Sequence, residues 1–154
     1  MNAISTRSRE LFDSGYFCAE SVVMAVAEYL KIDSELLPGL ATGFCGGISR
    51  NGNLCGALTG GIMALGLAYG RKGLKDGNDL VYAKVSRYIQ EFELTLGSSN
   101  CTDLLGCDIS TVEGSATFER QDLEARICAG ITEKAGAILM TLLAPEDDRF
   151  AARR

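Results

Sequence analysis

Residues 54–70, LCGALTGGIMALGLAYG, form a run without a charged side chain. Small residues recur every four positions along this run: Gly56, Gly60, Ala64 and Ala68. In an α-helix this spacing places them on one face, where a second helix can approach closely. Each glycine costs a helix about 1 kcal/mol relative to alanine, so their retention indicates that close packing or backbone access is needed here. We therefore expect a central helix over 54–70 that is buried on all sides.

The same region has to be tested as a membrane span, because residues 51–70 carry no charge and lie between Arg50 and Arg71. Both the length and the charged flanks suit a spanning helix. However, the segment contains many glycines, and it begins with an Asn-Gly dipeptide, which is typical of a turn. These features favour a helix buried in protein, and we expect no membrane span.

Helical patterns also occupy most of the chain on both sides of the central helix. Apolar residues repeat at helical spacing, without strand-like alternation, over four segments: 3–14, 18–30, 79–96 and 117–143. The clearest apolar face belongs to 79–96, which Gly97 is expected to end. The sequence thus predicts an all-α fold, a single-domain helical bundle with a glycine-rich central helix, spanning 1–154 with its core at about 12–143.

Capping and turn signals define the shorter elements. Asp33-Ser34 favours a short helix over 35–40, which Pro38 disturbs. Ser98-Ser99-Asn100 is expected to cap a short turn that begins at Cys101. The remaining features expected are loops over 43–53 and 106–115, a break near Gly130 and a helix end at Pro145.

The chain of 154 residues contains six cysteines and no histidine. The absence of histidine excludes Cys–His nucleophiles, Ser–His–Asp triads and histidine-ligated zinc or haem. The glycine-rich segments match neither a dinucleotide-binding nor a phosphate-binding loop pattern. No carboxylate pair suited to acid–base catalysis stands out either. Thiol–disulfide exchange, or a metal or iron–sulfur site with thiolate ligands, is what remains.

Charge and the N-terminal sequence narrow the partners and the compartment. The net charge is −5, and no run of Lys or Arg alternates with aromatic residues, so we expect no binding to nucleic acid. The N-terminal residues lack the apolar run that export requires, which favours a cytoplasmic protein. Thiols are kept reduced there, and this argues against a scaffold held by three disulfides.

Three cysteines, Cys18, Cys55 and Cys101, lie at the starts of expected helices. A helix N-terminus presents unpaired N–H groups and about half a positive charge, which favours the reactive thiolate. Each cysteine alone is most simply a small buried residue, but three together favour a shared site. Asp103 opposes thiolate formation at Cys101. Cys55 has the clearest helix start, so we expect it to be the most nucleophilic thiol.

The other three cysteines give weaker signals. Cys128 lies in the middle of an expected helix, on the flank of its apolar stripe. Cys107 follows Cys101 by six residues, a spacing that matches no common redox or ferredoxin motif. Cys45 lies between glycines in an expected flexible loop, where it is either exposed or paired.

Four of these cysteines carry a resemblance to a known family. Their contexts are Cys18-Ala19-Glu20-Ser21, Leu54-Cys55-Gly56-Ala57-Leu58-Thr59-Gly60-Gly61 after Gly46-Gly47-Ile48, Cys101-Thr102-Asp103-Leu104-Leu105-Gly106, and Cys128. Over roughly residues 12–140 the chain resembles the redox-active proteins named for the cysteine pattern C_GCAxxG_C_C. The resemblance implies that Cys18, Cys55, Cys101 and Cys128 are the shared cysteines and that Cys45 and Cys107 are additional. It also implies a small helical domain with a redox role.

The leading hypothesis is a redox or electron-transfer protein in which Cys18, Cys55, Cys101 and Cys128 converge at one pole of the bundle. These residues either cycle between dithiol and disulfide or ligate an iron–sulfur cluster. Gly56 and Gly60 would admit close backbone approach beside them. The partner would be an oxidoreductase or an electron-transfer protein. The alternative is a non-catalytic helical binding or assembly module with structural cysteines, whose apolar faces pack against a second subunit as a homo-oligomer.

Overall fold

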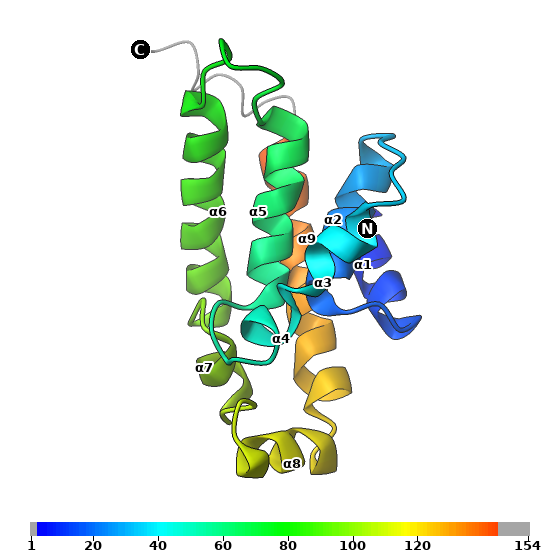
Figure 1. Ribbon diagram of the computed structural model, residues 1–154, viewed down its shortest axis with the longest axis vertical. Coiled ribbons are helices and arrows are strands. Elements are labelled where there is room, and N and C mark those ends of the chain that lie inside the picture. Colours follow the sequence, from blue (N-terminus) through cyan, green and yellow to red (C-terminus); the bar gives the residue numbers. More distant parts are fainter. Residues whose placement is uncertain (1–2, 145–154) are drawn as a thin grey trace.

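The computed structural model describes residues 3–144, which form helices joined by short loops (Figure 1). The elements in chain order are α1 (Ala3–Asp13), α2 (Cys18–Tyr29), α3 (Leu37–Thr42), α4 (Cys45–Ile48), α5 (Gly56–Tyr69), α6 (Asp79–Leu96), α7 (Cys101–Leu105), α8 (Val112–Arg120), the π-helix η1 (Glu124–Cys128) and α9 (Ala129–Leu143). Within this range the expected all-α bundle is confirmed. None of its helices is both long enough and apolar enough to cross a membrane.

The glycine-rich helix α5 lies in the centre of the bundle, as expected, although it begins at Gly56 rather than at 54. The expectation that it is buried on all sides is wrong: residues 56–61 are buried, but the second half is partly exposed and Gly66 is exposed. It packs against α2, α6 and α9, while α1 packs against α9 and α2 (Figure 1). The packing against α2 is close at Gly60, where a Cβ atom would lie 2.6 Å from the carbonyl oxygen of Ala19. At Gly61 a Cβ atom would meet the ring of Tyr88. Gly60 and Gly61 are therefore needed for the approach of the neighbouring helices.

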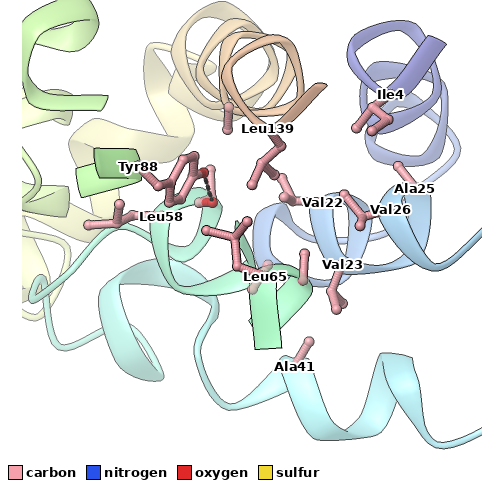
Figure 2. Close-up of a cluster of buried hydrophobic side chains, with 14 of the residues drawn as sticks. Ile4, Val22, Val23, Ala25, Val26, Ala41, Leu58, Leu65, Tyr88 and Leu139 are labelled. Atoms are coloured by element: carbon pink, nitrogen blue, oxygen red, sulfur yellow. Dashed lines mark hydrogen bonds between the residues drawn. The ribbon is translucent and has the colours of Figure 1, made fainter. Parts of the chain in front are cut away.

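The main core is formed by the inner faces of α1, α2, α5, α6 and α9 (Figure 2). Tyr88 of α6 is fully buried in it, and its hydroxyl donates a hydrogen bond of 3.0 Å to the carbonyl oxygen of Ala57 (Figure 2). Ile4 of α1 is also buried there, so the core includes residues before the expected start at 12. A second, smaller cluster lies at the α7 end of the bundle and consists of Cys101, Leu105, Ile109 and Leu123.

Several expected helix boundaries are confirmed. Helix α6 covers 79–96 as expected, and Gly97 ends it with a φ of 91°. Helices α1 and α2 match the segments expected at 3–14 and 18–30 to within one residue. The side chain of Asn100 caps α7 by accepting a hydrogen bond of 3.3 Å from the backbone N–H of Asp103.

Other boundaries differ from the sequence-based expectations. The short helix expected over 35–40 forms as α3, shifted toward Thr42, because Pro38 occupies its first turn rather than its interior. The segment expected to be a loop over 106–115 contains the start of α8, which Thr111 caps. The final helical region is interrupted around 121–123 and by η1 rather than near Gly130. The expected end at Pro145 lies outside the described residues.

The largest departure is in the region expected to be a loop over 43–53. Five consecutive residues there have positive φ angles: Gly46, Gly47, Ile48, Ser49 and Arg50. They form a left-handed helical turn that includes the end of α4. Residues with a Cβ atom pay roughly 1–2 kcal/mol each in this conformation, and Ile48 is β-branched. The turn is therefore held in place by its surroundings and not by local preference.

Candidate functional site

One pocket carries five of the six cysteines in its wall: Cys18, Cys45, Cys55, Cys101 and Cys128. Its volume is about 210 Å³. Phenylalanine, leucine and isoleucine side chains supply much of the remaining lining, and Arg50 and Glu124 bring charge to it. The structure thus brings to one pocket the four cysteines expected to converge, together with Cys45. Cys107 is not part of this lining.

A short backbone pairing holds Cys55 beside Cys101. Leu54 and Asn100 form an isolated antiparallel bridge. Around it, the N–H of Cys55 donates to the Ser99 carbonyl at 2.9 Å, and the N–H of Cys101 donates to the Asn53 carbonyl at 2.7 Å. The two cysteines are therefore diagonal neighbours, a relation that places Cα atoms about 7–8 Å apart. This pairing fixes the starts of α5 and α7 next to each other.

Cys55 caps the N-terminus of α5, as the sequence predicts, yet its thiol is not activated. The backbone N–H groups of Ala57 and Leu58 lower its pKa, which is the expected helix effect. Burial acts more strongly in the opposite direction and raises the pKa to about 11. The raised pKa gives no support to the expectation that Cys55 is the most nucleophilic thiol, because removal from water outweighs the helix N-terminus, and that expectation stays a prediction.

Cys101 and Cys128 are held as neutral thiols for the same reason. Burial raises the pKa of Cys101 to about 11, while Arg50 acts in the opposite direction. Burial likewise raises the pKa of Cys128 to about 12, with smaller contributions from Cys55 and Cys101. These sulfurs also raise one another's pKa, as expected of thiols that line one pocket. Cys128 ends the π-helix η1, a type of distortion that is frequent at functional sites.

Cys45 is the residue that the sequence analysis missed. It is buried, and the influence of the Cys18 thiol together with burial raises the pKa of Cys45 well above its ordinary value. The nearest sequence signal was its position between glycines, which reads as a flexible loop. The structure instead forms a left-handed turn directly after Cys45, which sequence patterns do not reveal, and Cys45 lies next to Cys18 across Gly56.

Gly56 lies directly against both Cys18 and Cys45. A Cβ atom at this position would collide with the sulfur of Cys18 and would lie 3.1 Å from the Cα atom of Cys45. The glycine therefore admits close approach beside Cys55, as expected. Gly60 lies one turn further along and admits the backbone of α2 instead. It thus contributes to helix packing and is not in the pocket lining.

The expected iron–sulfur ligand set can be compared with the arrangement of the side chains. All six cysteines are free thiols. Between residues 3 and 144, no group of three or more Cys, Asp or Glu side chains is arranged to hold a metal ion. A four-thiolate cluster needs all of its ligands around one centre. The cysteines in this conformation therefore do not fit such a cluster without rearrangement.

Comparisons with known proteins agree with this cysteine-rich site. Residues 16–142 match the model of the family described as "Putative redox-active protein (C_GCAxxG_C_C)". A protein of Archaeoglobus fulgidus named "Uncharacterized protein" is 35% identical over 148 residues, which cover 89% of this chain and 91% of that protein. No solved structure matches significantly. The chain belongs to the C_GCAxxG_C_C family of redox-active proteins.

Proposed function

We propose that this protein transfers electrons through dithiol–disulfide chemistry of the cysteines that line the pocket, with Cys18, Cys55, Cys101 and Cys128 as reacting residues. The proposal depends on one observation, which is that sulfurs from five separate elements reach a single pocket. Cysteines that serve only as small core residues have no reason to gather in this way. Membership of a family described as redox-active supports the same chemistry.

The reaction is an exchange with a disulfide of a partner, such as an oxidoreductase or an electron-transfer protein. One pocket thiol loses its proton and attacks a sulfur of the partner disulfide, which breaks the partner's S–S bond and releases one partner thiol. A second pocket thiol then attacks the mixed disulfide and releases the other partner thiol. The protein loses two electrons and two protons in forming its own disulfide, and the partner disulfide gains them.

Burial of the sulfurs has a direct consequence for this exchange. A thiol whose pKa lies near 11 is almost entirely protonated at neutral pH, and the protonated form is a poor nucleophile. The buried thiols of Cys55 and Cys101, called the inner thiols below, are therefore protected from nonspecific reaction in this conformation. We expect the thiol that reacts first to be one that the solvent can reach.

The experiment is a count of free thiols before and after oxidation. The reduced protein is treated with a small aromatic disulfide reagent, and the products are identified by mass spectrometry. Dithiol chemistry predicts that thiols disappear in pairs and that internal disulfides link pocket cysteines. If every lost thiol carries the reagent and no internal disulfide forms, the proposal is wrong.

The iron–sulfur version of the site makes a different prediction. Anaerobic purification and reconstitution with iron and sulfide would then give a coloured protein with bound iron. Bound iron that disappears when Cys18, Cys55, Cys101 and Cys128 are replaced by serine would favour a cluster over dithiol exchange. A colourless, iron-free protein after reconstitution would remove the cluster version.

The alternative of a binding or assembly module is tested with the same variant. If the protein with all four cysteines replaced keeps its partner complexes and its cellular phenotype, the cysteines are structural. A lost phenotype with an intact fold would instead support the redox role.

A further inference from the structure

We propose that Cys18 and Cys45 form the first disulfide of this site, so that Cys45 is a reacting residue. The inference rests on the proposed function and adds to it a cysteine outside the four that match the family pattern. It also assigns the first reaction to the partly buried Cys18, with Cys45 as its partner, ahead of the buried inner thiols Cys55 and Cys101. The argument for the pair comes from contact, from backbone donors and from the strained turn that holds Cys45.

Cys18 and Cys45 lie next to each other across Gly56. A Cβ atom at Gly56 would collide with the sulfur of Cys18 and would lie 3.1 Å from the Cα atom of Cys45. The S–H of Cys45 donates to the carbonyl oxygen of Ala41 at 3.6 Å. Both residues line the same pocket, so their sulfurs are positioned to approach each other for disulfide formation.

Backbone donors at the start of α2 point at the pair. The N–H groups of Ala19 and Glu20 act on the sulfur of Cys45 and favour its ionised form. The sequence led us to expect that this helix N-terminus would act on Cys18, the first residue of the helix. Instead, the N–H groups of α2 act on the sulfur of Cys45, which belongs to α4. These N–H groups act against the larger effects of Cys18 and burial, which keep the pKa of Cys45 raised. Cys45 is therefore the thiol that stays protonated and reacts second, after Cys18.

The left-handed turn explains how Cys45 is held there. Gly46 and Gly47 follow it directly, and a Cβ atom at Gly47 would lie 2.6 Å from the Cβ atom of Cys101. Ile48, Ser49 and Arg50 continue the turn at positive φ, at a cost of roughly 1–2 kcal/mol each. Strain of this size persists at sites where a geometry is needed for function. Here the strained residues lie three to five positions after Cys45, in the turn that continues from it.

Access distinguishes Cys18 from Cys55 and Cys101. Cys18 is only partly buried, and the neighbouring Phe17 is half exposed, so a reagent can approach from the solvent. Cys55 and Cys101 are both buried. Cys128 is also partly buried, but Cys18 is the one that lies against Gly56 together with the backbone of Cys45.

The oxidant in this reaction is a low-molecular-weight or protein disulfide. The Cys18 thiol gives up its proton to solvent, and its sulfur bonds to one sulfur of the oxidant. This breaks the S–S bond of the oxidant, and its other sulfur leaves as a thiolate and takes a proton. The Cys45 thiol then loses its proton and attacks the sulfur of Cys18. The second half of the oxidant leaves as a thiol. Two electrons pass from the cysteine pair to the oxidant.

The test uses the full chain and compares two single variants, Cys45→Ser and Cys107→Ser. Both remove a cysteine outside the family pattern, but Cys107 does not line the pocket. The reduced proteins receive one equivalent of a small aromatic disulfide, and samples quenched with acid are mapped by mass spectrometry. We expect the wild type and Cys107→Ser to yield a Cys18–Cys45 disulfide. In Cys45→Ser, the mixed disulfide on Cys18 should persist at least ten-fold longer.

The outcomes separate the inference from the proposed function. If Cys45→Ser is folded by circular dichroism and still resolves its mixed disulfide at the wild-type rate, Cys45 is not the partner, although dithiol chemistry stands. If the wild type forms its first disulfide between other pocket cysteines, the inference is likewise wrong while the proposed function holds. If the wild type forms no internal disulfide, both fail. Mapping of the wild type needs no variant, so misfolding of Cys45→Ser would not prevent the test.

Discussion

The sulfur of Cys55 experiences two opposite effects that the sequence can only partly anticipate. Its position at the start of α5 is evident from the sequence, and the N–H groups of Ala57 and Leu58 act on it as expected. The amount of water removed from that sulfur depends on α2, α7 and η1, which pack around it from distant parts of the chain. This second effect is the larger one, and it leaves the thiol neutral at physiological pH.

Stability of the reduced protein should therefore depend on pH in the alkaline range. In the unfolded chain Cys55 has an ordinary thiol pKa near 8.5, whereas folding raises it to about 11. The folded state holds its proton more tightly, so its stabilisation is complete below pH 8 and is lost between about pH 8.5 and 11. We expect a loss of about 3 kcal/mol at most from this thiol, measured by urea unfolding with excess reductant.

The control for this measurement is Cys55→Ala, which lacks the titrating group. Its free energy of unfolding should fall less steeply over the same pH range, although Cys101 and Cys128 still contribute to the slope. Equal slopes for the wild type and this variant would show that burial does not raise the pKa of Cys55.

Cys45 illustrates what the sequence could not reveal at the residue scale. Its neighbours Gly46 and Gly47 permit many conformations, and a pattern-based interpretation assigns such a segment to a flexible loop. The conformation that forms is a left-handed turn whose three non-glycine residues have no preference for it. Long-range contacts select the turn, so neither the burial of Cys45 nor its contact with Cys18 could be predicted from local sequence.

At the scale of the helix, the glycines of α5 have different roles that substitution can distinguish. Gly60 faces the backbone of Ala19, which cannot move aside, whereas nothing lies within 4 Å of a Cβ atom at Gly66. We expect Gly60→Ala to destabilise the protein by about 1–3 kcal/mol through overpacking. The matched change Gly66→Ala should stabilise it by up to about 1 kcal/mol, because alanine favours a helix. Thermal or urea unfolding measures the change in stability of each variant relative to the wild type. Equal effects at the two positions would contradict the close packing of α2 on α5.

The left-handed turn offers a second comparison at this scale, with the preference reversed. Ile48 has a φ of 63°, a conformation that glycine adopts freely and that alanine resists. We expect Ile48→Gly to be more stable than Ile48→Ala by about 1 kcal/mol, which is the opposite of the order at Gly66. Urea unfolding of the two variants measures the difference. If alanine is the more stable residue at position 48, the turn is not left-handed in solution.

Elements with a strong local signal were predicted well from the sequence. The apolar face of α6 and its end at Gly97, and the Asn100 cap of α7, match the structure because the interactions that define them lie within a few residues. The π-helical turn before Cys128 was missed, since its sequence carries an ordinary helical pattern. Its extra residue per turn reflects packing against α7 and the small cluster.

The whole molecule divides its apolar residues unequally between two clusters. Helix α5 lies inside the main core, whereas α8 lies across one end of the bundle (Figure 1). The small cluster beneath α8 contains Cys101, Leu105, Ile109 and Leu123. The bundle and its central helix could be predicted from periodicity and glycine spacing. The position of α8 apart from the main core could not be predicted, because it depends on three-dimensional packing that the local sequence pattern does not reveal.

This division predicts unequal protection of backbone amides from hydrogen exchange. Gly114 is the only buried residue of α8, so opening this helix exposes little apolar surface, while opening α5 disrupts the main core. We expect amides in α8 to exchange at least ten-fold faster than those in α5, measured by mass spectrometry on the reduced protein. Helix α6 is the control, because it is also largely exposed on one side but buries Tyr88 and Phe92.

Phe118 of α8 lines the pocket, so faster exchange there would mean that the wall over the inner thiols opens without unfolding of the core. Equal protection of α8 and α5 would instead mean that both clusters open as one unit, and that the inner thiols become accessible only on global unfolding.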